Sequence, residues 1–159
     1  MLILGIDPGS RVTGFGIIEV IGNRIQHRAH GTIKPKHTDF NQRIYSICGE
    51  INKIITQYPI HTTAIEQSFV NKNAQSALKL GQARGAIIQI IMQHQLSVAE
   101  YAARQVKATV TGYGAADKEQ IKQMIALRLN IPVEKLTHDA ADALAIAICH
   151  QQNLAVISS

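Results

Sequence analysis

Residues 2–20 read LILGIDPGSRVTGFGIIEV, which is an apolar run, a turn and a second apolar run. The first run, Leu2 to Asp7, is almost entirely apolar, as is typical of a strand buried on both faces of a sheet. Pro8-Gly9 interrupts it, and Val12 to Val20 resumes with β-branched residues and glycines. The stretch therefore predicts two strands joined by a short turn, with the carboxylate of Asp7 at the end of the first strand.

The rest of the chain continues with strand and helix patterns. Gly22-Asn23 is a turn signal, and Arg24 to Ile33 is a third strand candidate. Isoleucines at helical spacing run from Asp39 to Tyr58, and Pro59 ends that helix. Further elements are expected, in order, as a strand at His61 to Glu66, a helix from the cap residue Asn73 to about Gln95, a strand at Val98 to Tyr101, and helices near Ala103 to Thr109, Ala116 to Asn130 and Asp139 to Gln152. This order predicts a single α/β domain over residues 1–159, with a mixed five-stranded sheet flanked by helices.

Composition limits the class of protein. Of the 159 residues, 46% are hydrophobic, which indicates a globular chain and not a disordered one. No stretch approaches the roughly 20 apolar residues that span a bilayer, and the N-terminus MLILGID resembles a strand and not a signal peptide. Cys48 and Cys149 have no partner at metal-ligand spacing, so both are expected to be reduced thiols in the core. We therefore expect a cytoplasmic protein with no membrane partner.

Four acidic residues stand where predicted strands end or where the last predicted helix begins: Asp7, Glu66, Asp139 and Asp142. Each has an ordinary explanation, because Asp starts turns, charged residues often end strands, and acidic residues stabilise the first turn of a helix. Together they would form a set of oxygen ligands at one rim of the sheet, which hard divalent cations prefer. Residues three apart share a helical face at about 5–6 Å, so Asp139 and Asp142 can serve one site.

The net charge of the chain is +5, from 16 Lys and Arg against 11 Asp and Glu. Four of the acidic residues are the candidate metal ligands, so the remainder of the chain is more basic still. A basic body around an acidic pocket suits a polyanionic substrate such as a nucleic acid. A basic surface can also serve solubility alone, so the charge supports a nuclease but does not establish one.

The turn after the first strand has a rival explanation. Gly5 to Ser10, followed by Thr13-Gly14, resembles the first phosphate loop of actin-like ATPases and sugar kinases. Those proteins clasp the nucleotide between two such domains, and this chain is too short to provide both. A nucleotide-binding fragment remains one alternative on this motif.

Four segments taken together resemble the RuvC family of bacterial Holliday-junction resolvases. They are ILGIDPGSRVTGFG at 3–16, AIEQSFVNKNAQSALKLGQARG at 64–85, EYAARQVK at 100–107 and DAADALAIAI at 139–148. The resemblance covers nearly the whole chain, in family order and with family-like spacing. It implies a ribonuclease H-like fold of the retroviral integrase superfamily, a homodimer, and a magnesium-dependent crossover junction endodeoxyribonuclease of DNA recombination and repair. Four-way junction DNA is the implied substrate, and the RuvA–RuvB branch-migration complex is the implied partner.

The resemblance also implies roles for particular residues. The catalytic set is Asp7, Glu66, Asp139, Asp142, Lys107 and Lys118, of which the four acids bind metal. The DNA-binding set is Phe69, Lys72, Arg104, Lys107 and Lys118. Phe69 matches an aromatic residue that stacks on unpaired bases near the crossover. Some relatives carry histidine at the first position of the C-terminal acidic pair, but Asp139 fits that register here, so His138 is expected to neighbour the site.

Paired symmetric nicks through two-metal phosphodiester hydrolysis are the expected reaction, with two Mg²⁺ ions per site and Mn²⁺ as an expected substitute. Asp7 is expected to bridge the ions, with Glu66 on one and the C-terminal pair mainly on the other. A junction-binding module without catalytic activity is the second alternative.

Gly81 and Gly85 lie one turn apart on a predicted helix, and their smooth face is a candidate dimer contact or a place where the helix packs on the sheet.

Overall fold

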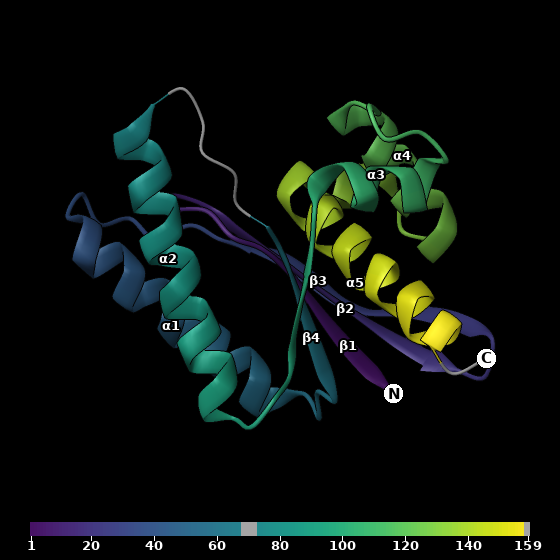
Figure 1. Ribbon diagram of the computed structural model, residues 1–159, viewed down its shortest axis with the longest axis horizontal. Helices are drawn as coiled ribbons and strands as arrows, with labels where there is room; N and C mark the ends of the chain where they lie inside the picture. Colours follow the sequence, from purple (N-terminus) through teal and green to yellow (C-terminus); the bar gives the residue numbers. More distant parts are fainter. Residues whose placement is uncertain (68–72, 158–159) are drawn as a thin grey trace.

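A five-stranded mixed sheet forms the centre of the protein, in the order β3-β2-β1-β4-β5 (Figure 1). The computed structural model describes residues 1–67 and 73–157. The strands are β1 (Leu2–Asp7), β2 (Thr13–Ile21), β3 (Arg24–Ile33), β4 (Thr62–Glu66) and β5 (Val98–Tyr101). β1, β2 and β3 pair antiparallel, whereas β4 pairs parallel with both β1 and β5. The predicted mixed five-stranded sheet is thereby confirmed.

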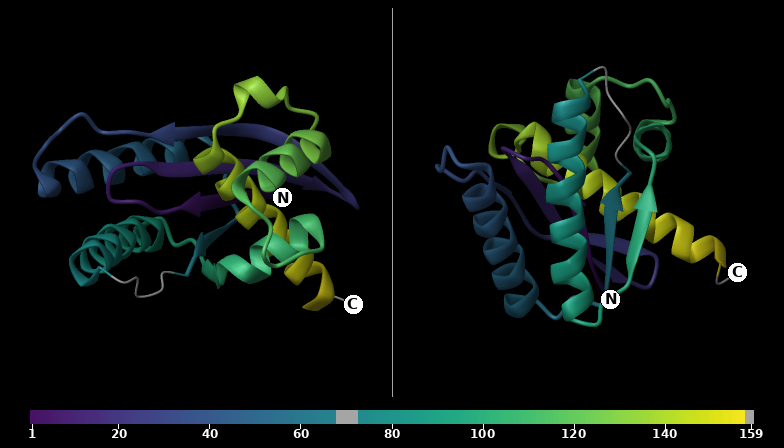
Figure 2. Two further views of the ribbon diagram at one scale, coloured as in Figure 1. Left: turned by 90° about the horizontal axis from the view of Figure 1, so that it is seen from above. Right: turned by 60° about the vertical axis from the view of Figure 1, so that its left-hand side comes forward.

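Helices cover both faces of this sheet (Figures 1 and 2). They are α1 (Phe40–Gln57), α2 (Ala74–Gln93), α3 (Ala103–Thr111), α4 (Lys118–Leu129) and α5 (His138–Ile157), with a short 3-10 helix, η1 (Val133–Lys135). The predicted positions are confirmed to within a few residues at most ends. η1 was not predicted, because it is only a single turn that follows Pro132.

Local sequence explains where the helices begin. The carboxylate of Asp39 accepts a hydrogen bond from the amide of Gln42 at 2.8 Å and so caps α1. The predicted cap of α2 is also confirmed, because the Asn73 side chain accepts from the amide of Ser76 at 3.1 Å. Asp117 forms a reciprocal capping box at the start of α4.

Two apolar layers form the core, one on each face of the sheet. Ile3 of β1 faces the layer built by α3, α4 and α5, whereas Leu4 and Ile6 face the layer built by α1 and α2. All three side chains are fully buried. This arrangement explains why β1 is a continuous apolar run and lacks the alternation of a half-exposed strand.

α5 lies directly against the backbone of β1 and β2, because glycines face it. A Cβ at Gly5 would overlap the carbonyl oxygen of Ala143, and a Cβ at Gly14 would overlap the carbonyl oxygen of Asp139. A Cβ at Gly16 would come within 2.5 Å of Leu144. The helix is apolar on all sides from Ala143 to Cys149 and fully buried there, since α3 and α4 cover its outer side.

The far half of α5 is held by directional polar contacts. His150, only 5% exposed, lies 2.9 Å from the hydroxyl of Thr62 on β4 and 2.8 Å from the hydroxyl of Tyr101 on β5. Hydrogen bonds to both ring nitrogens fix the rotation of the helix more narrowly than apolar contacts alone. The rotation of α5 is therefore set where its first turn meets the rim of the sheet.

Neither cysteine is in a disulfide. Cys149 is buried and Cys48 is half-buried, in agreement with the predicted free thiols. Within the described residues, no helix is both long and apolar enough to cross a membrane.

The contact between β1 and α5 yields a stability prediction. Gly5→Ala should lower the unfolding free energy by about 1–3 kcal/mol, because the added methyl group pushes α5 off the strand. Gly49→Ala is the matched control, since Gly49 lies in α1 with open space around it. That change should raise stability by roughly 0.5–1 kcal/mol through helix propensity. Urea unfolding of both variants measures the difference, and equal effects would contradict the packing described.

Candidate metal-binding site

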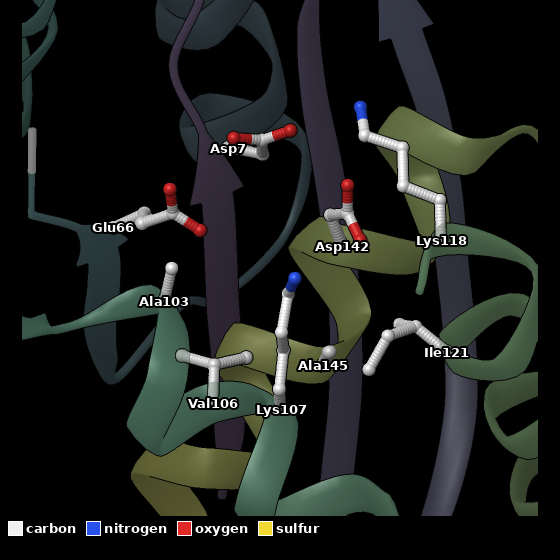
Figure 3. A pocket seen from close by; sticks show the side chains of 9 residues that line it. All are labelled: Asp7, Glu66, Ala103, Val106, Lys107, Lys118, Ile121, Asp142 and Ala145. Carbon is white, nitrogen blue, oxygen red and sulfur yellow. The ribbon is translucent and has the colours of Figure 1, made fainter. Parts of the chain in front are cut away.

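A cavity of about 220 Å³ opens at the rim of the sheet where β1 and β4 end and α5 begins (Figure 3). Its lining residues are Asp7, Glu66, Ala103, Val106, Lys107, Lys118, Ile121, Asp142 and Ala145. Asp7 and Glu66 reach it from adjacent parallel strands, whose preceding residues Ile6 and Ile65 are paired in register. Asp142 reaches it from the first turns of α5. The structure thus brings together three carboxylates that lie far apart in the sequence.

The fourth predicted ligand, Asp139, does not line this cavity. It lies one helical turn before Asp142, and its backbone packs against Gly14, the residue of β2 that pairs with Asp7. Its charge still acts on the cavity, because it raises the pKa of both Asp7 and Asp142. Asp139 is therefore beside the three lining carboxylates.

The negative charges of these carboxylates are only partly balanced by neighbouring positive charges. Burial, followed by the charges of Asp142, Glu66 and Asp139, raises the pKa of Asp7 to about 8. Burial also raises the pKa of Glu66 and of Asp142, and in both cases Lys107 and Lys118 oppose the rise. The two lysines thus offset the repulsion only in part.

The side chains fit a hard divalent cation in their chemistry. The acidic lining residues offer carboxylate oxygens, the ligands that Mg²⁺ and Mn²⁺ prefer, and a cation would reverse the unfavourable field at Asp7. As they stand, the carboxylates surround the cavity without converging on one point. Among the described residues, no group of three or more acidic, histidine or cysteine side chains is close enough together to hold an ion.

The two predicted catalytic lysines both line the cavity. Figure 3 shows the ammonium group of Lys107 rising from α3 between Glu66 and Asp142. Lys118, the first residue of α4, extends alongside Asp142. Both positive charges therefore stand beside the carboxylates, where they can contact an anion that enters the cavity.

None of the remaining predicted residues that the structure describes is among those that line the carboxylate cavity. Arg104 does not line the carboxylate cavity but a neighbouring cavity of about 570 Å³, which shares Lys107 with it. Phe69 and Lys72 lie outside the described residues. His138 is not among the lining side chains, and its Nε2 atom lies 3.8 Å from the carboxylate of Glu119 on α4. The expectation that His138 neighbours the site agrees with this position.

Sequence reasoning missed Arg84 of α2. Its Nε atom donates a hydrogen bond to the backbone carbonyl of Glu66 at 3.1 Å, and its Nη2 atom lies 2.7 Å from the carboxylate of Glu100. The arginine thereby fixes the end of β4 where Glu66 leaves the strand. The sequence predicted the helix that contains Arg84. Helical periodicity, however, does not show which strand end a long side chain reaches.

The turn after β1 is closed by its own residues. The hydroxyl of Thr13 donates to the carbonyl of Gly9 at 3.0 Å and accepts from the amide of Gly9 at 3.3 Å. Thr13 is fully buried. Because the amide of Gly9 is already engaged, this turn lacks one of the free donors that a phosphate loop needs. That observation disfavours the nucleotide-binding alternative.

Comparison with known proteins gives consistent matches over nearly the whole chain. The family model described as crossover junction endodeoxyribonuclease RuvC matches residues 3–150. A relative of that description from Geobacter sulfurreducens is 51% identical over 160 residues, which cover 100% of this chain and 96% of the relative. One from Pasteurella multocida is 52% identical over 153 residues, covering 96% and 80% respectively.

Solved structures give the same result. Thermus thermophilus RuvC in complex with Holliday junction substrate superposes with a TM-score of 0.89 at 26% identity, covering 98% of this chain and 96% of that one. The fowlpox virus Holliday junction resolvase superposes with a TM-score of 0.62 at 14% identity, covering 97% and 99%, and shares the fold. The predicted ribonuclease H-like fold is thereby confirmed.

The raised pKa of Asp7 leads to a prediction about stability. Between its ordinary pKa of 3.8 and about 8, folded Asp7 keeps a proton that the unfolded chain has lost. Stability therefore falls as the pH rises through that window. Asp7→Asn removes the titration, so at pH 7 in chelator it should raise the unfolding free energy by at most about 4 kcal/mol, because each pH unit between 3.8 and 7 corresponds to ~1.4 kcal/mol.

Thermal melts of the wild type and the variant at pH 5 and pH 7 measure this effect. The gain should be larger at pH 7, and added Mg²⁺ should stabilise the wild type more than the variant. Asp39→Asn is the control, because asparagine caps a helix as well as aspartate does. A lower melting temperature for Asp7→Asn in chelator would contradict the electrostatic description of the cavity.

Proposed function

This chain belongs to the RuvC family of crossover junction endodeoxyribonucleases, and from that premise we propose that it resolves four-way DNA junctions at the cavity of Asp7, Glu66 and Asp142. The observation that carries the proposal is the meeting of three carboxylates and two lysines in one open cavity. We place the whole activity in a single nuclease domain over residues 1–159. We also propose a cytoplasmic location, because the proposed substrate is DNA.

Membership of this nuclease family implies dependence on a divalent metal. We propose Mg²⁺, with two ions per site and with Mn²⁺ able to substitute. Asp7, Glu66 and Asp142 would hold the metal, and Asp139 would complete the set from the same helix. Bound there, divalent cations supply a nucleophile at neutral pH and relieve the negative charge of the phosphate.

The chain's own residues bind and orient the DNA strand. Lys107 lies within the cavity and can contact a non-bridging oxygen of the phosphate that is cut, where negative charge grows as the bond breaks. Lys118 lines the same cavity and can hold the same phosphate or the next one along the strand. The apolar walls, Val106, Ile121 and Ala145, exclude part of the water and so strengthen these contacts.

Arg104 extends the basic lining away from the cut. It shares a cavity with Lys107, so a strand that passes Lys107 can continue along Arg104. We propose the DNA-binding roles of Phe69 and Lys72 on family resemblance alone. In the same way, the RuvA–RuvB branch-migration complex is proposed as a partner because the chain belongs to this family.

We propose that the protein is a homodimer formed through the outer face of α2. A Cβ at Gly81 or Gly85 would meet no atom within 4 Å among the described residues, which rules out packing of this face on the sheet. The same face exposes Leu78 at 63% and Met92 at 57%. Small residues between exposed apolar side chains suit close contact with a second copy. A two-fold dimer would present two cavities to a junction that is itself nearly two-fold symmetric.

Junction cleavage tests the proposed function. The protein, a synthetic four-way junction and a matched duplex are incubated with Mg²⁺, and the cuts are mapped on each strand. The wild type should make paired symmetric nicks in the junction only. Asp7→Asn should slow nicking by more than about 100-fold while junction binding persists. Asp39→Asn should cut as the wild type does.

Three results would contradict the proposed function or the proposed catalytic centre. Junction binding without cleavage in any divalent metal would favour a module that lacks catalytic activity. Measurable ATP affinity would favour the nucleotide-binding alternative. Nicking by Asp7→Asn at near wild-type rate would show that the catalytic centre lies at another place.

The dimer has its own test. Leu78→Glu places a charge on the exposed face of α2, so we expect sedimentation at micromolar concentration to show monomer where the wild type shows dimer. Paired nicks should then give way to single, uncoordinated nicks. Leu127→Glu is the matched control, because Leu127 is 77% exposed on α4, away from α2. A monomeric wild type would overturn the proposal.

A further inference from the structure

A second cavity with basic walls opens at the same end of the sheet as the carboxylates. Its volume is about 350 Å³, and its lining residues are Arg11, Lys34, Pro35, His37, Thr38 and Arg43. It lies between the loop that follows β1 and the loop that leads from β3 into α1. Three of the lining residues carry a permanent positive charge, and no acidic side chain is among the described residues that line it. The cavity is therefore a site of positive potential.

Arg43 holds the two loops in place. From α1, its Nε atom donates to the carbonyl of Ser10 at 3.1 Å, and its Nη1 atom donates to the carbonyl of Thr38 at 2.6 Å. The guanidinium also lies over the ring of Phe40, 5.7 Å from its centre. Because these contacts exist before any ligand binds, little loop ordering would be needed on binding.

One acidic residue, Asp39, directly follows the lining segment and is engaged at the start of α1. Asp39 follows Thr38 directly, and its carboxylate accepts the hydrogen bond from the amide of Gln42 that caps α1. That carboxylate thus acts on the helix start, while Arg11 and Lys34 remain exposed at the mouth of the cavity. The three cations of the lining outnumber this one carboxylate, so the cavity keeps a net positive charge.

The strand register places this cavity relative to the carboxylates. Asp7 pairs with Gly14, and Gly14 pairs with Thr32. Two strand spacings separate Asp7 from Thr32, which is about 10 Å. Lys34 follows two residues later at the same end of the sheet, and Figures 1 and 2 both show the loops after β1 and β3 at that end. Lys107 and Arg104 flank the carboxylates on the opposite side, since α3 follows β5 at the other edge of the sheet.

We propose that this basic cavity binds a backbone phosphate of the junction DNA, so that the DNA is held on both sides of the carboxylates. Guanidinium and ammonium groups are the usual phosphate ligands, and the cavity offers both. Such contacts fix the position of the DNA without reading its sequence. At 3.4 Å of rise per nucleotide, a distance of about 10 Å or more puts this phosphate roughly three to five nucleotides from the cut. The inference rests on the proposed function, because it assumes that the carboxylate cavity cuts DNA.

The salt dependence of junction binding tests the proposal. Affinity is measured by fluorescence anisotropy at several salt concentrations for the wild type and for Arg11→Ala/Lys34→Ala. Loss of a phosphate contact should weaken binding and lower the slope of log affinity against log salt by about one per residue removed. Arg24→Ala is the control, because it removes an exposed cation at the β2–β3 turn, the opposite end of the sheet. It should keep the wild-type slope.

Arg43 is left unchanged in this test because its loss would loosen both loops. A thermal melt checks that the double variant is folded, and the single exchange Lys34→Glu, at an exposed loop position, provides a second route with the same expected weakening. Phosphate ethylation interference then locates the contact. Ethylation about three to five nucleotides from the cut should weaken the wild type but not the double variant.

The outcomes separate this inference from the proposed function. If the wild type neither binds nor cuts junctions, the proposed function fails. If the wild type cuts junctions while both the double variant and Lys34→Glu keep the wild-type slope and affinity, only the phosphate-binding inference is overturned. An equal loss of slope in Arg24→Ala would also overturn it, because the effect would then reflect overall charge.

Discussion

The direct contact between the backbone of α5 and the backbone of β1 and β2 is the constraint on which the site depends. Three glycines on the strands leave room for it, and His150 fixes the helix at its other half through Thr62 and Tyr101. Interiors are close-packed, so a helix held in this way has little freedom to slide or rotate. The carboxylate of Asp142 therefore stands at a defined place beside Asp7, although 135 positions separate them in the chain.

The carboxylates at this rim of the sheet lower the stability of the folded protein. The carboxylates there are partly desolvated and raise one another's pKa, which costs stability whenever no cation is bound. Two apolar layers, one on each face of the sheet, supply the stability that offsets this cost. Burial and mutual repulsion disfavour the ionised carboxylates and a bound cation would favour them, so metal binding at this rim would be coupled to loss of protons.

Two arginines from the helices on one face hold the rim loops. Arg84 of α2 donates to the carbonyl of Glu66, and Arg43 of α1 donates to the carbonyls of Ser10 and Thr38. Both use a long side chain to satisfy backbone oxygens that a loop leaves without a partner. Arg84 also lies on the helix that is proposed to form the dimer.

Much of the fold was already determined by the sequence, because local patterns decide local structure. An apolar run defined β1, isoleucine spacing defined α1, and Asp39 and Asn73 marked the helix starts through hydrogen bonds that reach only three residues. The strand-end positions of Asp7 and Glu66 followed in the same way. Lys107 and Lys118, by contrast, came from family resemblance, since nothing in periodicity distinguishes them from other exposed lysines on helices.

Only the tertiary structure decided how these elements converge. Spacing put Asp139 and Asp142 on one helical face, but the rotation of α5 determines that Asp142 lines the cavity while Asp139 lies beside it against Gly14. Arg84 and the basic cavity around Arg43 were also beyond sequence reasoning. Their contacts join residues 18 to 33 positions apart through long, flexible side chains, and such contacts depend on how whole elements pack.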